Sequence, residues 1–176
     1  MGNPMTDVQI RLATDADRAP ITELYNHFVV ETSVTFDDRA WTVEERAPWF
    51  ERFAPEGRYR LLVAEEGGRL LGYAGTLPFR AKAAYETSVE TTIYLAEAGQ
   101  GRGLGRRLYE RLFEEMAGED VHRLLAGVTL PNDASLALHE KLGFTSVGTF
   151  REVGRKFGQY WDVAWYEREN GPAPGR

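Results

Sequence analysis

Hydrophobic residues alternate with polar ones in several stretches of the chain, and this period of two is typical of a β-strand. A continuous apolar run over residues 123–130 predicts a strand that is buried on both faces. Glu66-Gly67-Gly68 separates two of the alternating stretches and is typical of a hairpin turn. Together these patterns predict strands over residues 8–12, 59–65, 69–78, 88–95, 123–130, 144–153 and 159–168.

Apolar residues that recur every three or four positions predict helices between these strands. The clearest stripe begins at Leu104 and runs through Leu108 and Leu112 to Met116. Another stripe, from Ile21 to Phe28, predicts a helix that begins after cap residues at 14–17. Further cap-like sequences predict a helix from residues 42–45 to about Phe53 and a short helix from 131–133 to Gly143.

The predicted order of elements is β-α-α-β-β-β-α-β-α-β-β, which indicates one α/β domain with a mixed sheet of about seven strands and about four helices. We expect this domain to span residues 8–168, with a flexible N-terminus at 1–7 and a flexible tail at 169–176. The chain contains no internal repeat and no linker that would divide the domain.

A glycine-rich turn, Gln100-Gly-Arg-Gly-Leu-Gly105, joins the strand at 88–95 to the helix at 104. Glycines let the backbone adopt positive φ and come close to a ligand. The first turn of the helix offers unpaired N–H groups, and these favour an anion such as a phosphate. Four nearby arginines, at positions 102, 106, 107 and 111, add positive charge. The turn is therefore a candidate anion cradle, and the alternative is a tight turn followed by a solvated arginine face.

Composition narrows the class of protein. Of the 176 residues, 43% are hydrophobic and 27% are charged, which favours a folded core over disorder. The chain has no cysteine and three scattered histidines, so we expect no disulfide and no metal site, and a cytoplasmic location is consistent with this. A net charge of −6 argues against general nucleic-acid binding, and no apolar run is long enough to span a membrane.

The spacing of Gln100, Gly103 and Gly105 resembles the pyrophosphate-binding signature Gln/Arg-x-x-Gly-x-Gly/Ala of the GNAT acetyltransferase superfamily, and the predicted order of elements matches the GNAT fold. Other stretches resemble one branch, the acetyltransferases of phosphinothricin, methionine sulfoximine and methionine sulfone. This resemblance runs from about residue 10 to 166. It rests on Asn26-His27, Thr35-Phe36, Arg80–Tyr85, Val89–Leu95, Leu130–Ser135 and His139–Phe144.

The resemblance implies that the co-substrate is acetyl-CoA and that each matching residue has a role. Glu90 matches the general base, and the phosphinothricin branch looks to carry a histidine at the position of His139. The cofactor would be held by Ile93, Tyr94, Leu95, Gln100, Gly101, Arg102, Gly103, Leu104, Gly105, Arg106, Asn132, Ser135 and Lys141. The acceptor would contact Phe36, Arg80, Lys82, Tyr85, Glu90 and Asn132.

The chemistry of amine acetylation gives Glu90 a physical reason for this role. An α-amine with a pKa of roughly 8 is largely protonated at neutral pH and must lose a proton before it can attack a thioester. Burial of Glu90 in a strand would raise the pKa of its carboxyl toward the working range. A glutamate on a solvated strand face is the alternative.

The predicted role of His139 is to donate a proton to the leaving thiolate, because many superfamily members have a tyrosine at this position before Leu-Gly-Phe. A histidine that binds the cofactor or packs in the core is an equal alternative. Asn132, Ser135 and His139 share one helix face at spacings of three and four. That face is either a polar stripe beside the cofactor or a solvated surface.

Arg80 and Lys82 favour an acceptor that carries a carboxylate, phosphinate or sulfone oxygens. We therefore predict transfer of an acetyl group to the α-amine of a small amino-acid analogue. The alternatives are a GNAT enzyme for a polyamine, an aminoglycoside or a protein N-terminus, and a non-catalytic coenzyme A sensor. The resemblance also implies a homodimer. The sequence does not choose among detoxification, antibiotic self-protection and amino-acid metabolism as the natural role.

Overall fold

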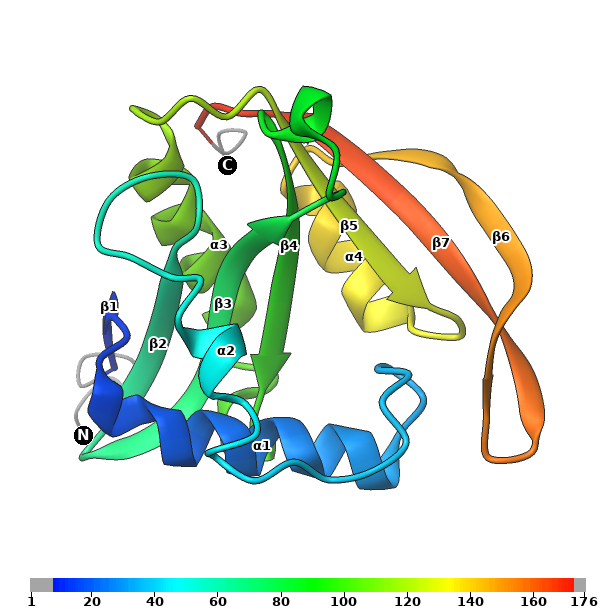
Figure 1. Cartoon of the computed structure of the whole chain (residues 1–176), viewed down its shortest axis with the longest axis horizontal. Helices are drawn as coiled ribbons and strands as arrows, with labels where there is room; N and C mark the ends of the chain where they lie inside the picture. The colour runs from blue at the N-terminus through cyan, green and yellow to red at the C-terminus, as the bar shows by residue number, and fades with distance from the viewer. Residues whose placement is uncertain (1–7, 173–176) are drawn as a thin grey trace.

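The computed structural model describes residues 8–172. Within this range seven strands form one mixed sheet in the order β1-β2-β3-β4-β5-β7-β6, and four α-helices flank it (Figure 1). This architecture confirms the predicted α/β fold; the predicted flexible N-terminus at 1–7 lies outside the described residues. The strands are β1 (Gln9–Leu12), β2 (Leu61–Glu66), β3 (Arg69–Pro78), β4 (Ser88–Leu95), β5 (Arg123–Thr129), β6 (Thr145–Lys156) and β7 (Gln159–Glu169), and the helices are α1 (Arg18–Glu31), α2 (Ala47–Phe50), α3 (Leu104–Met116) and α4 (Asp133–Lys141).

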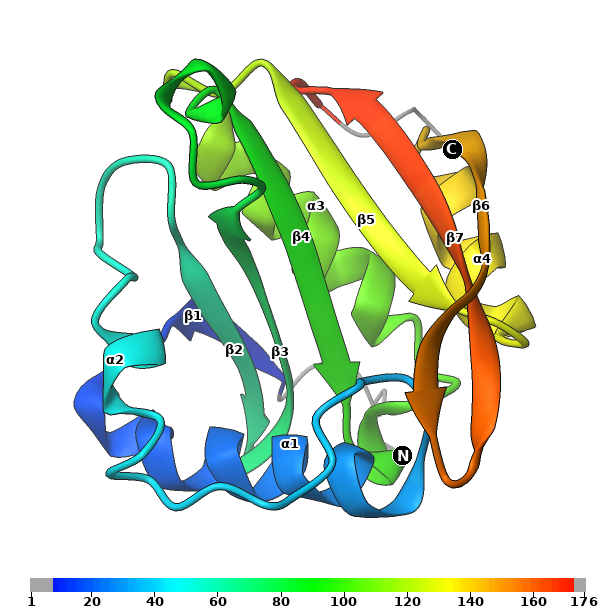
Figure 2. The same cartoon turned by 45° about the vertical axis from the view of Figure 1, so that its right-hand side comes forward.

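Different helices cover the two faces of the sheet, as Figure 2 shows, with α1 and α2 on one side and α3 and α4 on the other. The alternation along β2 explains why both faces are apolar. Leu62 and Ala64 belong to the larger core, which contains the buried stripe of α3, whereas Leu61 and Val63 belong to a smaller core with residues of α1 and α2. The sheet is therefore the middle of three layers.

The two central strands, β4 and β5, pair over a short distance and then separate. They run parallel and are paired over Ser88–Glu90 and Arg123–Leu125, although β4 continues to Leu95 and β5 to Thr129. Figure 1 shows the two ribbons diverging below this point. Beyond Glu90, the edge of β4 that faces β5 is consequently not paired with it.

The second helix is shorter than the sequence predicts. The predicted capping box forms, because Thr42 N donates to Glu45 Oε2 at 2.9 Å and Glu45 N donates to Thr42 Oγ1 at 3.2 Å. However, α2 comprises a single turn, and residues 52 and 53 continue in tighter turns whose N–H groups bond three residues back. The region 42–53 is thus a compact corner rather than a regular helix.

The last hairpin is longer than the sequence predicts. Residues 154–156, which we expected to lie in the loop, belong to β6, because Phe157 and Gly158 alone make the turn with positive φ values of 53° and 74°. Lys156 Nζ donates to the carbonyl oxygen of Thr35 at 2.8 Å. The hairpin tip therefore contacts the loop that follows α1.

The folded chain also extends past residue 168, where we expected the flexible tail to begin. Glu169 ends β7, and the Asn170 side-chain amide donates to the carbonyl oxygens of Met116 and Val121 at 2.8 and 3.0 Å. These bonds tie the residue after β7 to the end of α3, so the predicted boundary is wrong by several residues. Residues 173–176 lie outside the described range.

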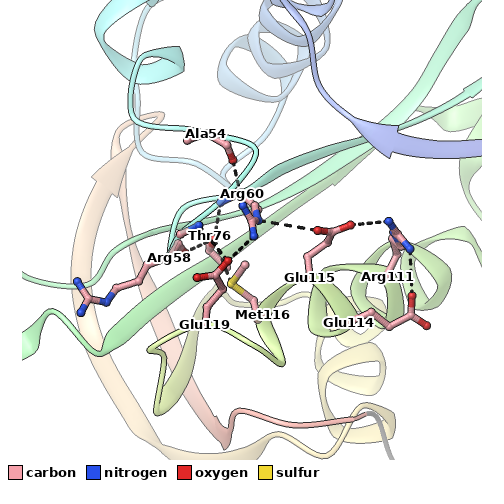
Figure 3. A network of polar contacts seen from close by, with 10 residues as sticks. Ala54, Arg58, Arg60, Thr76, Arg111, Glu114, Glu115, Met116 and Glu119 are labelled. Atoms are coloured by element: carbon pink, nitrogen blue, oxygen red, sulfur yellow. Dashed lines mark hydrogen bonds and ion pairs between the residues drawn. The ribbon is translucent and has the colours of Figure 1, made fainter.

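A buried ion-pair network fastens the start of β2 to the end of α3 (Figure 3). Arg60, which is 4% exposed, bonds Glu119 through Nη2 and the Ala54 carbonyl oxygen through Nη1, and its Nε lies 3.9 Å from Glu115 Oε2. The Arg60 backbone N–H donates to Thr76 Oγ1 at 2.9 Å. One arginine thus links the loop before β2, strand β3 and helix α3.

Candidate active site

The separation of β4 and β5 opens a cavity of about 730 Å³. One wall is the free side of β4, the opposite wall is the end of β5, and α4 and the start of α3 close the rest. The residues of β4 that line it are Glu90, Thr91, Thr92, Ile93, Tyr94 and Leu95, and the other lining residues that we discuss below are Val34, Thr35, Gln100, Gly101, Tyr109, Asn132, Ser135 and His139.

The glycine-rich turn has the backbone geometry that we predicted for an anion cradle. Gly101 and Gly103 both have a φ of 70°, and a Cβ atom at either position would meet no atom within 4 Å, so a ligand can approach the backbone there. Gly103 is the N-cap of α3, whose first N–H groups have no partner within the helix. Gly105 differs, because a Cβ there would lie 3.1 Å from the Leu138 side chain. The third glycine thus allows α3 and α4 to pack closely.

The arginines near the turn do not gather around it as we expected. Arg102 forms an ion pair with Glu66 at 2.7 Å, and Arg106 forms one with Glu110 at 2.6 Å. Arg107 donates to the Val8 carbonyl oxygen at 3.2 Å, and Arg111 pairs with glutamates further along α3. Spacing along a helix cannot show which acid each guanidinium will reach. The backbone N–H groups and the helix dipole are therefore the main attraction for an anion at this turn.

Glu90 lies where the pairing of β4 and β5 ends. It is opposite Leu125 of β5 and Leu77 of β3, and its partly buried side chain lines the cavity. Burial raises the pKa of the Glu90 carboxyl above its usual value, and the positive charge of Arg80 partly opposes this. The alternative of a fully solvated strand glutamate is wrong.

His139 is buried and forms hydrogen bonds through both ring nitrogens. Nδ1 lies 2.7 Å from the Ser135 carbonyl oxygen, which can only accept, so Nδ1 carries the proton. Nε2 lies 3.0 Å from the Tyr109 hydroxyl, and this hydroxyl donates to Thr91 Oγ1 at 3.2 Å. Burial lowers the pKa of His139, which favours the neutral ring. The general-acid role of His139 stays a prediction.

The polar face of α4 points into the cavity, as the spacing of Asn132, Ser135 and His139 suggested. Asn132 also caps the helix, because its Oδ1 accepts from the Ser135 backbone N–H at 3.2 Å. Lys141, which we expected at the cofactor, is exposed at the end of α4 and does not line the cavity. It lies two residues beyond His139, on a different face of the helix.

The predicted acceptor residues, apart from Glu90 and Asn132, do not line this cavity. Phe36 packs on Gly154 of β6, and a Cβ at Gly154 would lie 2.2 Å from its ring. Arg80, Lys82 and Tyr85 are exposed in the loop before β4, where the Arg80 guanidinium lies over the Phe79 ring at 4.5 Å. Neighbouring positions, Val34 and Thr35, line the cavity in place of Phe36.

A second cavity, of about 300 Å³, lies on the α1 and α2 side of β3 and β4, and sequence reasoning missed it. Thr92 and Tyr94 line both cavities, so the two adjoin along β4. Its remaining lining residues are Tyr25, Asp37, Trp41, Glu45, Arg46, Trp49, Tyr73 and Leu77. All the lining residues together come from five segments. The one sequence signal for this cavity was the number of aromatic residues between positions 25 and 49.

Residues 8–172 contain neither a membrane-spanning helix nor a cluster of metal ligands. No helix in this range is long and apolar enough to cross a membrane. No group of three or more histidine, aspartate or glutamate side chains in the same range has the geometry to hold a metal ion.

Comparison with known proteins identifies the family. The model of the acetyltransferase (GNAT) domain matches residues 10–165. A phosphinothricin N-acetyltransferase from Streptomyces coelicolor is 55% identical over 164 residues, which are 92% of this chain and 96% of the relative. An L-methionine sulfoximine/L-methionine sulfone acetyltransferase from Salmonella typhimurium is 39% identical, over 90% of this chain and 92% of the relative.

Solved structures agree with this family. A GNAT superfamily phosphinothricin acetyltransferase from Sinorhizobium meliloti, in complex with acetyl-CoA, superposes with a TM-score of 0.86 at 31% identity and covers 94% of this chain and 90% of that one. A putative acetyltransferase from Salmonella typhimurium with acetyl-CoA gives the same TM-score at 36% identity, with coverages of 94% and 95%. The chain therefore belongs to the GNAT acetyltransferases, in the branch that contains the phosphinothricin and methionine sulfoximine acetyltransferases, and it is an N-acetyltransferase.

Proposed function

We propose that this enzyme transfers the acetyl group of acetyl-CoA to the α-amine of a small amino-acid analogue, with phosphinothricin, methionine sulfoximine and methionine sulfone as the candidate acceptors. The observation that carries the proposal is the place of Glu90, a partly buried carboxylate at the point where β4 and β5 separate. Relatives named for these acceptors are 55% and 39% identical to this chain.

The cavity has the features that acetyl-CoA requires. Open space over Gly101 and Gly103, together with the N-terminus of α3, suits its pyrophosphate. The edge of β4 at Ile93, Tyr94 and Leu95 faces the cavity and suits the amide groups of its pantetheine arm. Bound there, acetyl-CoA would supply a thioester that an unprotonated amine can attack.

Glu90 would remove the proton of the acceptor amine, directly or through one water molecule. Its raised pKa makes it a better proton acceptor than a solvated carboxylate. A backbone N–H on the free edge of β4, at Tyr94 or Leu95, is in the position to stabilise a developing oxyanion.

For His139 we propose a positioning role in place of the acid role. Its Nε2 lies 3.0 Å from the Tyr109 hydroxyl, and this contact holds the hydroxyl at the wall of the cavity, where it donates to Thr91 Oγ1. The proton on Nδ1 is directed toward the Ser135 carbonyl oxygen and away from the reacting groups.

We also propose that the protein forms a homodimer through the last hairpin. Strand β6 is at the edge of the sheet, and its side chains Val147, Phe150 and Val153 are 57–59% exposed. An exposed apolar edge strand favours association with another chain. Sedimentation of a Phe150→Glu variant should show a loss of dimer, whereas the matched change Val30→Glu on exposed α1 should not; a monomeric wild type would contradict the proposal.

The decisive experiment measures thiol release from acetyl-CoA with a panel of acceptors. The panel contains the three candidate amino-acid analogues, L-methionine, spermidine and a short peptide. We expect turnover with the first three and a fall of about 100-fold or more in kcat for Glu90→Gln, since general-base removal commonly has this effect. Glu86→Gln, a change in an exposed glutamate of the neighbouring loop, is the matched control.

The outcomes separate the alternatives. Turnover confined to spermidine or the peptide would contradict the proposed class of acceptor but would still support transfer of an acetyl group from acetyl-CoA. Coenzyme A binding without any turnover would favour a sensor. Normal kcat in Glu90→Gln would exclude Glu90 as the base.

A further inference from the structure

The second cavity contains a buried arginine without an acidic partner. Arg46 is the N-cap residue of α2 and is 5% exposed. Its guanidinium carbon lies 4.3 Å from the centre of the Tyr25 ring and 4.2 Å from that of Trp49. No carboxylate in the described part of the chain lies within 4.0 Å of it, and its Nη1 is buried without a hydrogen-bond partner. A buried cation in this state is costly unless an anion joins it.

A second donor beside Arg46 is also unsatisfied. The hydroxyl of Tyr73 is fully buried and has no hydrogen-bond partner, and Tyr73 lines the same cavity. Arg46 is close enough to Tyr73 to oppose the rise that burial causes in the pKa of its hydroxyl. The two groups come from different elements, α2 and β3, and lie close together, but neither Arg46 Nη1 nor the Tyr73 hydroxyl has a hydrogen-bond partner with good geometry.

The two acids of the cavity are already engaged. Asp37 Oδ2 accepts from the Tyr25 hydroxyl at 2.7 Å and from Trp41 Nε1 at 2.9 Å. Glu45 accepts from Arg39 and from the Thr42 backbone N–H. Their bonds hold Asp37 and Glu45 in the cavity wall, which leaves Arg46 available to an anion from outside the chain.

The cavity is placed to receive one end of the acceptor. Leu77, which is opposite Glu90 in the β3–β4 ladder, lines it, as do Thr92 and Tyr94 on the same face of β4. Since a strand rises about 3.3 Å per residue, Thr92 lies roughly 7 Å along β4 from Glu90. A small amino acid with its amine at Glu90 therefore reaches the cavity entrance with its other end.

We propose that the cavity around Arg46 is an oxyanion subsite that binds a carboxylate or phosphinate group of the acceptor and so selects anionic acceptors. Carboxylates and phosphinates each present two oxygens that match the donor edge of a guanidinium, and the flanking rings of Tyr25 and Trp49 hold its plane. This inference rests on the proposed function. It assigns to Arg46 the selectivity that the sequence had suggested for Arg80 and Lys82.

Tryptophan fluorescence gives a readout that does not depend on catalysis, because Trp41 and Trp49, two of the four tryptophans, line the cavity. We would titrate the enzyme with glutarate, an oxyanion probe without an amine, and with L-phosphinothricin. Saturable quenching is expected in the wild type. Arg46→Met should raise Kd by about 10- to 100-fold, the value of one charge-assisted hydrogen bond or two.

Matched variants keep the test informative. Arg52→Met removes an exposed cation a few residues away and should leave Kd unchanged. Arg46→Lys keeps the charge but loses the planar donor edge, and its Kd should fall between those of the wild type and Arg46→Met. Unfolding midpoints of all variants would show that each one is folded. Absence of saturable quenching in the wild type, or an equal Kd in Arg46→Met, would overturn the proposal.

Acetyl transfer identifies which oxyanion occupies the subsite. If the α-carboxylate binds there, Arg46→Met raises the acceptor KM equally for phosphinothricin and methionine sulfone. If the phosphinate binds there, the KM rises for phosphinothricin alone. Arg46-dependent quenching without acetyl transfer would contradict the proposed function but retain the oxyanion subsite. Acetyl transfer with an unchanged acceptor KM in Arg46→Met would contradict the oxyanion subsite but retain the proposed function.

Discussion

Arg60 and Arg46 are both almost fully buried, at 4% and 5% exposure, but their surroundings are opposite. Arg60 bonds Glu119, lies 3.9 Å from Glu115 and donates to the Ala54 carbonyl oxygen (Figure 3). Arg46 has aromatic rings at 4.2–5.4 Å in place of acids, and a cavity beside it. Burial is thus a poor guide to the function of a charged residue, whereas the identity of its partners separates a structural arginine from a candidate binding group.

The largest effect on stability is expected for Arg60→Met. Removal of the cation leaves Glu119 and Glu115 without their buried partner, so we expect the free energy of unfolding to fall by about 3 kcal/mol. Urea unfolding measures this change. Arg111→Met, which removes a half-exposed arginine from the same network, is the control and should cost much less. Equal losses in the two variants would mean that Arg60 is no more important than a surface ion pair.

Arg46→Met should change stability far less, in contrast to its expected effect on binding. The loss of ring contacts is offset by the removal of a buried charge that has no carboxylate partner, so we expect a change of less than about 1 kcal/mol. The same urea experiment measures it. A loss as large as that of Arg60→Met would show that Arg46 is structural and would end the contrast between the two arginines.

The smallest effect concerns Glu90, another partly buried charge at the large cavity. Its folded-state pKa is raised above the usual 4.5, so its stabilising contribution is present below pH 4.5 and is lost as the pH rises through the folded-state pKa. Ionised Glu90 therefore lowers stability at neutral pH. Glu90→Gln should unfold at a higher urea concentration than the wild type at pH 7, and this advantage should disappear near pH 4. A stability advantage of Glu90→Gln that does not depend on pH would exclude ionisation of Glu90 as its cause.

The elements of the fold could be predicted because each depends on a local pattern. Period-two alternation located the strands, and the α3 stripe from Leu104 to Met116 is buried as predicted. The glycine turn was predictable for a similar reason, since positive φ at Gly101 and Gly103 follows from the residue type. The errors lie at ends of elements, where one tight turn at Phe157 and Gly158 or one hydrogen bond of Asn170 decides the boundary.

Contacts between distant segments could not be predicted. Phe36 packs on Gly154, and Arg102 pairs with Glu66 of another strand, so neither takes the position that its own stretch of sequence suggested. Arg46 was missed because its cavity exists only where α1, the following loop, α2, β3 and β4 meet. Glu90 was found because the stretch Val89–Leu95 resembles the family, whereas its place at the end of the β4–β5 pairing could not be predicted.

The separation of β4 and β5 also bears on how the fold protects an open strand edge. A free strand edge usually invites another protein chain to add to it and begin aggregation. Here the free edge of β4 lies inside the fork of the sheet, in a cavity that α4 and the end of β5 also line. A narrow arm with a few amide groups can enter this fork, whereas a folded neighbour with its own side chains is too wide. The fold thus leaves this strand edge open to a small molecule while it keeps the same edge away from other proteins.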